Sequence, residues 1–293
     1  MTVDDPHVPD VQALEAVSRE TVSVRGETMH YLRAGDTGPA LVLLHGGIID
    51  AAHVSWAPQL APLAEHARVY APNFPGYGPT PLPDDALTIG RHVDSIAGFL
   101  DALDLEDAVV AGISMGGGVA VGLGLDHPER LAHVVALDAM ALGSELAGGK
   151  LTWLLAKLRV TNRLSVALMR RSRQYVRLGL ESLVHEDWFV PSALVDLVQA
   201  EARRPGAGAA FRNFRAHEVG WRGYRTDYTA RLSELSVPAT LVHGQDDAVF
   251  PVAWSERAAS RMPAAELHLF EDCGHLPTWE RTDDVAAVLA ALL

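Results

Sequence analysis

Short apolar runs alternate with helical patterns along this chain, and that alternation limits the folds it can adopt. The run from Ala40 to His45 is typical of a strand that is buried on both faces of a sheet. After it, the pattern predicts in order a helix at 55–65, a strand at 67–71, a helix at 91–103, a strand at 107–111, a helix from residue 115 and a strand at 131–137. Strands that are joined by helices at this spacing form a mostly parallel sheet covered on both faces.

Segments near both ends of the chain add further strands. Residues 20–25 and 28–33 flank Gly26 and predict an antiparallel hairpin. In the last quarter the alternation resumes with a strand at 239–243, a helix at 252–261, a strand at 266–270 and a helix at 283–293. We therefore predict an α/β fold with a doubly wound, mostly parallel sheet of about eight strands.

The alternation is interrupted between residues 142 and 231, which we predict to form a helical insertion. Apolar residues recur there with helical spacing, at Leu151, Leu154, Leu155 and Leu158, and no segment has a convincing strand pattern. The chain is thus predicted to consist of a core, residues 1–141 and 232–293, and a cap, residues 142–231.

Charge is segregated between these two parts. Residues 146–231 carry 15 Lys+Arg and 7 Asp+Glu, whereas the rest of the chain carries 9 Lys+Arg and 30 Asp+Glu. Two interpretations are open. The basic cap attracts an anionic small-molecule substrate into the gap above the core, or the opposite charges help the cap to dock.

Composition excludes several classes of function. A net charge of −13 disfavours a nucleic acid as partner, and no apolar stretch is long enough to span a membrane. The acidic N-terminal residues lack the pattern of a signal peptide. A lone cysteine, Cys273, excludes an intramolecular disulfide and fits a reducing compartment, so we expect a cytoplasmic protein.

One hydroxyl stands between two glycines directly after a predicted buried strand, in Gly112-Ile113-Ser114-Met115-Gly116. This is the pattern of a nucleophile elbow, in which a serine occupies the sharp turn between a strand and a helix. Glycine is needed two residues before and two residues after Ser114, because the strained turn leaves no room for Cβ atoms.

Three other predicted strands end in residues that could complete a site around Ser114. His45-Gly46-Gly47 ends the first buried strand, His243-Gly244-Gln245-Asp246-Asp247 ends another, and Asp272-Cys273-Gly274-His275 follows the last. Open α/β sheets bind their ligands at these strand ends. A serine nucleophile needs an imidazole base, and the imidazole needs a carboxylate that orients it. Backbone N–H groups of Gly47 and Met115 are the natural donors to an oxyanion.

With these motifs in register, the chain resembles the serine hydrolases of the α/β-hydrolase fold superfamily over essentially its whole length. The motifs that carry the resemblance are Leu44-His45-Gly46-Gly47, Pro75-Gly76-Tyr77-Gly78, the Ser114 elbow, Gly244-Gln245-Asp246-Asp247 and Gly274-His275. The resemblance implies Ser114 as nucleophile, His275 as base and Asp247 as the acid, with Asp246 and Asp138 as alternatives for the acid. It also implies that residues 142–231 are the cap that this family places over its active site.

The function implied is hydrolysis of a carboxylic ester or lactone through an acyl-enzyme, without a cofactor. An alternative within the family is hydrolysis of a carbon–carbon bond in a diketone-like substrate. Those enzymes resemble one another in a Trp after the catalytic His and a Gly-Pro-Gly oxyanion loop, whereas here Leu276 follows His275 and Ile48-Ile49 follow Gly47. A further alternative is a small-molecule binding protein or receptor with a slow or vestigial triad.

The remaining candidates concern the substrate pocket and metals. We expect His45, Gly46, His53, Trp56 and Leu276 to line the pocket, with packing of the following helix as the other interpretation of His53 and Trp56. The histidines show no H-x-H or H-E-x-x-H spacing and there is no cysteine cluster, so we expect no metal.

Overall fold

The computed structural model describes residues 17–146, 149, 153, 159–186 and 188–293. The N-terminal segment 1–16 and the helical spacing expected at Leu151, Leu154, Leu155 and Leu158 lie outside the described residues. Within the described part of the chain, no helix is both long enough and apolar enough to cross a bilayer.

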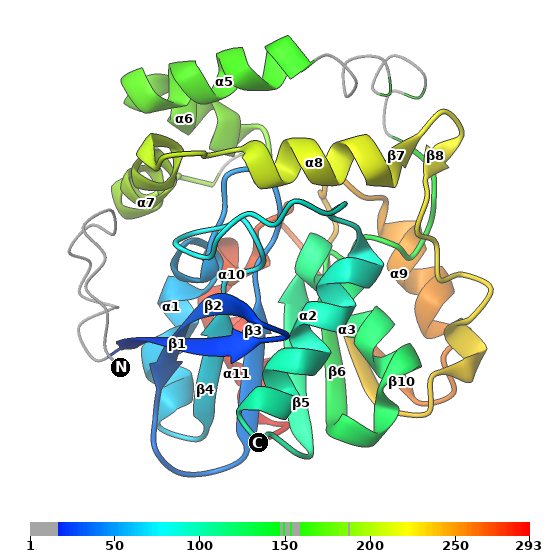
Figure 1. Ribbon diagram of the computed structural model, residues 1–293. Helices are drawn as coiled ribbons and strands as arrows, with labels where there is room; N and C mark the ends of the chain where they lie inside the picture. The colour runs from blue at the N-terminus through cyan, green and yellow to red at the C-terminus, as the bar shows by residue number, and fades with distance from the viewer. Residues whose placement is uncertain (1–16, 147–148, 150–152, 154–158, 187) are drawn as a thin grey trace.

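The core of the fold is one sheet of eight strands. In chain order they are β1 (Ser18–Val24), β2 (Glu27–Ala34), β3 (Ala40–Leu44), β4 (Arg68–Pro72), β5 (Ala108–Ile113), β6 (Leu131–Leu137), β9 (Ala239–Gly244) and β10 (Ala265–Phe270). Their order across the sheet is β1-β2-β4-β3-β5-β6-β9-β10 (Figure 1). β2 pairs antiparallel with β1 and with β4, and the other neighbours are parallel. The predicted α/β fold is confirmed.

Alternate side chains of the central strands pack on opposite faces of the sheet. In β3, Val42 and Leu44 belong to one hydrophobic cluster while Leu41 and Leu43 belong to another, and all four are fully buried. A strand with helices on both faces has no solvent side, which explains its unbroken apolar sequence. Full burial of each such side chain contributes roughly 1.5–3 kcal/mol.

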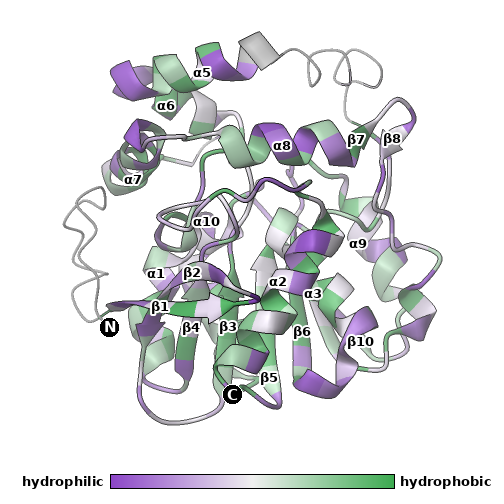
Figure 2. Cartoon of the chain, viewed as in Figure 1, coloured by the Kyte–Doolittle hydropathy of each residue, from purple (hydrophilic) through white to green (hydrophobic). Residues whose placement is uncertain are grey.

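Six helices surround the sheet, namely α1 (Ala52–Ala64), α2 (Ile89–Ala102), α3 (Met115–Asp126), α9 (Val252–Ala259), α10 (Pro277–Glu280) and α11 (Thr282–Ala290). Apolar residues of α2, α3 and α9 join the cluster on one face, and those of α1 and α11 join the cluster on the other. Figure 2 shows the result as mostly green central strands, whereas the edge strand β1 and parts of the surrounding helices carry the hydrophilic colours.

Four helices of the predicted cap lie beyond the carboxyl ends of the parallel strands (Figure 1), namely α5 (Arg159–Arg171), α6 (Arg173–Glu181), α7 (Ser192–Arg203) and α8 (Ala209–Glu218). The expectation of no strand in this segment is wrong at one place, because β7 (Val219–Gly220) and β8 (Gly223–Tyr224) form a small antiparallel hairpin. Strands of two residues are too short to show any periodicity in a sequence. The division at residues 142 and 231 stays a prediction.

Candidate active site

Ser114 lies on a sharp turn between β5 and α3. Its backbone has φ +56° and ψ −116°, a strained conformation for a residue with a side chain. A Cβ atom at position 112 would collide with the backbone of Gly116 and Gly117, and one at position 116 would collide with the carbonyl oxygens of Leu44 and His45. Both glycines of the motif are therefore required by close backbone packing.

The side chains of Ser114, His275 and Asp247 form a hydrogen-bonded row. Ser114 Oγ is 3.0 Å from His275 Nε2, and His275 Nδ1 is 2.8 Å from Asp247 Oδ2. Ser114 follows β5, Asp247 lies in the loop after β9, and His275 lies in the loop after β10. Because these parallel strands end at the same edge of the sheet, residues 161 positions apart come into contact.

Of the two adjacent aspartates after β9, Asp247 is the one that reaches His275. Asp246 instead places Oδ2 2.9 Å from Nδ1 of His185, at the boundary with the cap. The other Asp247 carboxylate oxygen, Oδ1, accepts the N–H of Val249 at 2.7 Å. Burial works to raise the pKa of Asp247, but the charge of His275 and hydrogen bonds from His243 and His275 outweigh it, so that pKa lies below its usual value.

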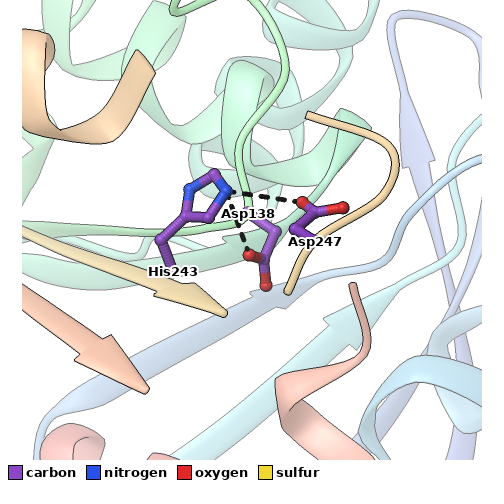
Figure 3. Close-up of side chains that lie close together, drawn as sticks. All are labelled: Asp138, His243 and Asp247. Atoms are coloured by element: carbon purple, nitrogen blue, oxygen red, sulfur yellow. Dashed lines mark ion pairs between the residues drawn. The ribbon is translucent and has the colours of Figure 1, made fainter. Parts of the chain in front are cut away.

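A second buried carboxyl group, Asp138 after β6, lies beside Asp247 and His243 (Figure 3). Nε2 of His243 is 3.5 Å from Asp138 Oδ1 and 3.4 Å from Asp247 Oδ2. The same nitrogen is 3.2 Å from the carbonyl oxygen of Phe250, which can only accept, so it carries a proton. Burial and the charge on Asp247 raise the pKa of Asp138 well above its usual value. Of the two carboxyl groups, Asp247 therefore ionises more readily, beside His275.

The loop that carries His275 is held by Glu280, at the end of α10. Glu280 Oε2 accepts the N–H of Gly274 at 2.9 Å and the N–H of His185 at 2.8 Å, and Oε1 accepts the N–H of Leu276 at 3.0 Å. The N–H of His275 itself donates to the carbonyl oxygen of Leu183 at 2.7 Å. Sequence patterns did not predict this role of Glu280, because its three N–H partners lie in two loops that are far apart in the sequence.

Gly47 and Met115, the predicted oxyanion donors, both line the cavity beside Ser114. The loop of Gly47 is fixed by Asp50, which sequence analysis also missed. Asp50 Oδ2 accepts the N–H of Gly46 at 2.8 Å and the hydroxyl of Ser55 at 2.7 Å. Burial raises the pKa of Asp50 to about 6, against the lowering effect of these hydrogen bonds.

The row of Ser114, His275 and Asp247 opens into a cavity of about 460 Å³ between the core and the cap helices. Most of its wall is apolar, as is usual for a site that takes a small organic molecule. Of the five residues expected to line this pocket, Gly46 and Leu276 are among its lining residues.

The other three expected pocket residues lie behind the wall. Trp56 is fully buried in the core cluster. His45 is also fully buried, with Nδ1 2.8 Å from the carbonyl oxygen of Gly46 and Nε2 accepting the N–H of Phe74 at 3.1 Å, and burial lowers its pKa to about 3. His53 faces the cap, with Nε2 3.2 Å from Glu201 Oε1. These side chains hold the loops and the cap in place rather than the substrate.

Two groups of described side chains are close enough together to be considered as metal ligands. One is Asp138, His243 and Asp247, whose atoms are already engaged in the contacts around His275. The other is His185, Asp246 and Asp272 at the edge of the cap. The expectation that the chain needs no metal stays a prediction.

Comparison with known proteins adds to this geometry. A family model described as "alpha/beta hydrolase fold" matches residues 39–282. The chain is 29% identical over 266 residues to a 2-hydroxymuconate semialdehyde hydrolase of Pseudomonas sp. (strain CF600), which covers 89% of each chain. It is 31% identical over 260 residues to a pimeloyl-[acyl-carrier protein] methyl ester esterase of Aromatoleum aromaticum, covering 86% of this chain and 96% of the esterase.

Among solved structures, the fold is similar to that of a serine hydrolase involved in carbazole degradation. The TM-score is 0.80 at 20% identity, over 94% of this chain and 98% of that chain. The similarity extends over the core and the helices above it, since it covers nearly the whole length of both chains.

Proposed function

Because the chain belongs to the alpha/beta hydrolase fold family, whose model matches residues 39–282, we propose that it is a serine hydrolase that cleaves a carboxylic ester or lactone without a cofactor. The observation that carries the proposal is the hydrogen-bonded row of Ser114, His275 and Asp247 at the floor of a mostly apolar cavity. A nucleophile, its base and the group that orients the base are thus within reach of one bound molecule.

In the first half of the proposed reaction, Ser114 Oγ attacks the carbonyl carbon and passes its proton to His275 Nε2. Asp247 is ionised, since its pKa is lowered, and it stabilises the positive charge that forms on His275. The N–H groups of Gly47 and Met115 would donate hydrogen bonds to the carbonyl oxygen as it becomes negatively charged. Loss of one such donor typically raises the barrier by about 3–4 kcal/mol. His275 then protonates the leaving alcohol oxygen, and the acyl group remains on Ser114.

In the second half, a water molecule takes the place of the leaving alcohol. His275 removes a proton from this water, the resulting nucleophile attacks the acyl carbon, and Ser114 Oγ leaves with the proton from His275. The products are a carboxylic acid and the free enzyme. When the substrate is a lactone, the new carboxylic acid and the new alcohol are groups of one hydroxy acid.

Carbon–carbon bond hydrolysis of a diketone-like substrate is the second candidate. The similarity to a 2-hydroxymuconate semialdehyde hydrolase favours it. The loops on either side of Ser114 favour the ester or lactone instead, because Leu276 stands after His275 and Ile48-Ile49 stand after Gly47. A slow or vestigial site in a binding protein is the third candidate.

A panel of p-nitrophenyl esters, lactones and diketone-type substrates tests the proposal with purified wild-type protein and Ser114→Ala. We expect turnover of esters or lactones by the wild type and a loss of about 10⁴-fold or more in Ser114→Ala. A fluorophosphonate probe should label the wild type and not the variant.

The outcomes separate the three candidates. Turnover confined to diketones would favour the carbon–carbon hydrolase, whereas tight binding without turnover or labelling would favour the binding protein. Ester turnover that persists in Ser114→Ala would place the reaction elsewhere in the molecule.

A further inference from the structure

The described wall of the active-site cavity contains a single Lys or Arg side chain, Arg215. It comes from α8 of the cap, whereas the other lining residues are mainly aliphatic or aromatic. Charged side chains are depleted from such cavities, because burial of a charge costs free energy unless a partner compensates it. A guanidinium in this position therefore requires an explanation.

Arg215 has no ionic partner among the residues that the structure describes. None of the described ion pairs or hydrogen bonds involves its guanidinium, which instead lies over the ring of Phe211, with Cζ 5.6 Å from the ring centre. Burial lowers the pKa of Arg215, partly offset by the neighbouring Tyr224. Arginine nevertheless stays protonated in proteins, so the half-buried guanidinium brings a positive charge to the cavity wall without an ionic partner among the described residues.

Contacts of the neighbouring aromatic rings place Arg215 on the side of the cavity above the reacting centre. Phe211, on which it stacks, would be 3.1 Å from a Cβ atom at position 47, next to the proposed oxyanion donors. On the other side, Tyr224 lies 5.9 Å from Phe250, and Phe250 lies 5.5 Å from the His275 ring, measured between ring centres. Arg215 thus faces the space that a substrate bound at Ser114 would fill.

The cavity wall also contains one Asp or Glu side chain among the described residues, Asp50, which belongs to the core rather than to the cap. Asp50 is attached to the Gly46 loop, where a Cβ atom at position 46 would be 2.8 Å from Asp50 Oδ2 and 3.5 Å from Ser114 Cβ. The described residues show no ion pair between Asp50 and Arg215. Asp50 accepts hydrogen bonds from Gly46, Ala51 and Ser55 and therefore does not compete with a negative group on the substrate for the guanidinium of Arg215.

We propose that Arg215 binds a carboxylate of the substrate, so that the enzyme acts on esters or lactones that carry a second, anionic group remote from the scissile carbonyl. This inference rests on the proposed function, since it identifies the substrate class of the same site. A guanidinium matches a carboxylate with two parallel hydrogen bonds, and Tyr224, also in the wall, offers a hydroxyl beside it. The apolar remainder of the cavity holds the chain between the two groups.

The test compares two esters of equal chain length, p-nitrophenyl hydrogen adipate, which has a free carboxylate, and p-nitrophenyl hexanoate, which has a methyl group there. The measured quantity is the ratio of their kcat/KM values, charged over neutral. We expect the wild type to prefer the charged ester, and Arg215→Met to reduce the ratio by about 10-fold to 100-fold. Arg215→Lys should retain part of the preference, because it keeps the charge and loses the bidentate geometry.

Arg222→Met is the matched control, because Arg222 is an exposed cap arginine. It should leave the ratio within about 2-fold of the wild type. The preference should also persist in about 1 M salt, where long-range attraction by the cap as a whole is screened.

Three results would overturn the assignment of Arg215, namely no preference in the wild type, an unchanged ratio in Arg215→Met, or an equal fall in Arg222→Met. If the wild type hydrolyses hexanoate through Ser114 but ignores the carboxylate, only this inference fails. If it hydrolyses neither of these esters and no ester or lactone of the panel above, the proposed function fails as well.

Discussion

At the scale of single residues, the carboxyl group of Asp50 is in an unfavourable electrostatic position. It accepts N–H groups from Gly46 and Ala51 and the hydroxyl of Ser55, which all favour its ionised form. Burial nevertheless dominates and raises its pKa to about 6, from 3.8. The native protein therefore keeps a proton on Asp50 in a pH range where the unfolded chain has lost it.

This difference predicts how stability depends on pH. Between about pH 4 and pH 6 the native state binds more protons at this site than the unfolded state, so the contribution of Asp50 to the free energy of unfolding falls as pH rises. The expected fall is about 2 kcal/mol. Asp50→Asn removes the titration, so its unfolding free energy, measured with urea at several pH values, should decline less over this range.

The exposed residue Asp84 provides the control, because Asp84→Asn makes the same chemical change in solvent. Its pH profile should parallel that of the wild type. Parallel profiles for Asp50→Asn and the wild type would show that Asp50 ionises alike in both states.

The same residues show which parts of the candidate site could be predicted. Ser114, Asp247 and His275 each follow a strand at an offset that the sequence displays, and the structure brings their side chains together. Asp50 and Asp138 could not be assigned, because their properties depend on burial and on hydrogen bonds to other loops. His53 and Trp56 follow the Gly47 loop in sequence, but the helical turn of α1 directs them away from the cavity.

At the scale of elements, two helical glycines have opposite roles. Gly116 is the second residue of α3 and lies against the end of β3, where a Cβ would be 2.5 Å from the carbonyl oxygen of His45. Gly179 is inside α6, and a Cβ there would meet no atom within 4 Å. Glycine in a helix interior costs about 0.5–1 kcal/mol relative to alanine.

Alanine substitutions should therefore have opposite effects at these two glycines. Gly179→Ala should raise the free energy of unfolding by about 0.5–1 kcal/mol, because open space receives the methyl group. Gly116→Ala should lower it by more than about 2 kcal/mol, since backbone atoms would have to move. Thermal and urea unfolding of both variants measure this, and a destabilised Gly179→Ala would contradict the contacts described for α6.

The core strands could be predicted from the sequence, whereas the short strands of the cap could not. The central strands β3 and β5 are apolar without interruption, and the core strands have turn signals around them, so their positions followed from the sequence. Strands β7 and β8 have two residues each and are created by contacts of the cap, such as the N–H of Tyr224 with the carbonyl oxygen of Ser144. No local sequence pattern predicts a pair of strands as short as these.

At the scale of the whole molecule, the core and the cap contact each other close to His275 in the candidate site. His53 of α1 contacts Glu201 of α7, and His185 contacts Asp246. Glu280 joins the same two parts, since it accepts backbone N–H groups from both sides of His275 and from His185. One carboxylate therefore contacts both the loop that carries the imidazole and the cap.

Replacing this carboxylate should affect stability and turnover together. Glu280→Gln loses the charge and one acceptor oxygen, so at least one partly buried N–H loses its partner, and we expect the free energy of unfolding to fall by about 1–3 kcal/mol. Since a small displacement of a reacting group is costly, kcat for ester hydrolysis should fall by about 10-fold or more. Glu256→Gln makes the same change on the exposed side of α9 and should alter neither quantity. If Glu280→Gln loses stability but keeps the wild-type kcat, Glu280 secures the cap without positioning His275.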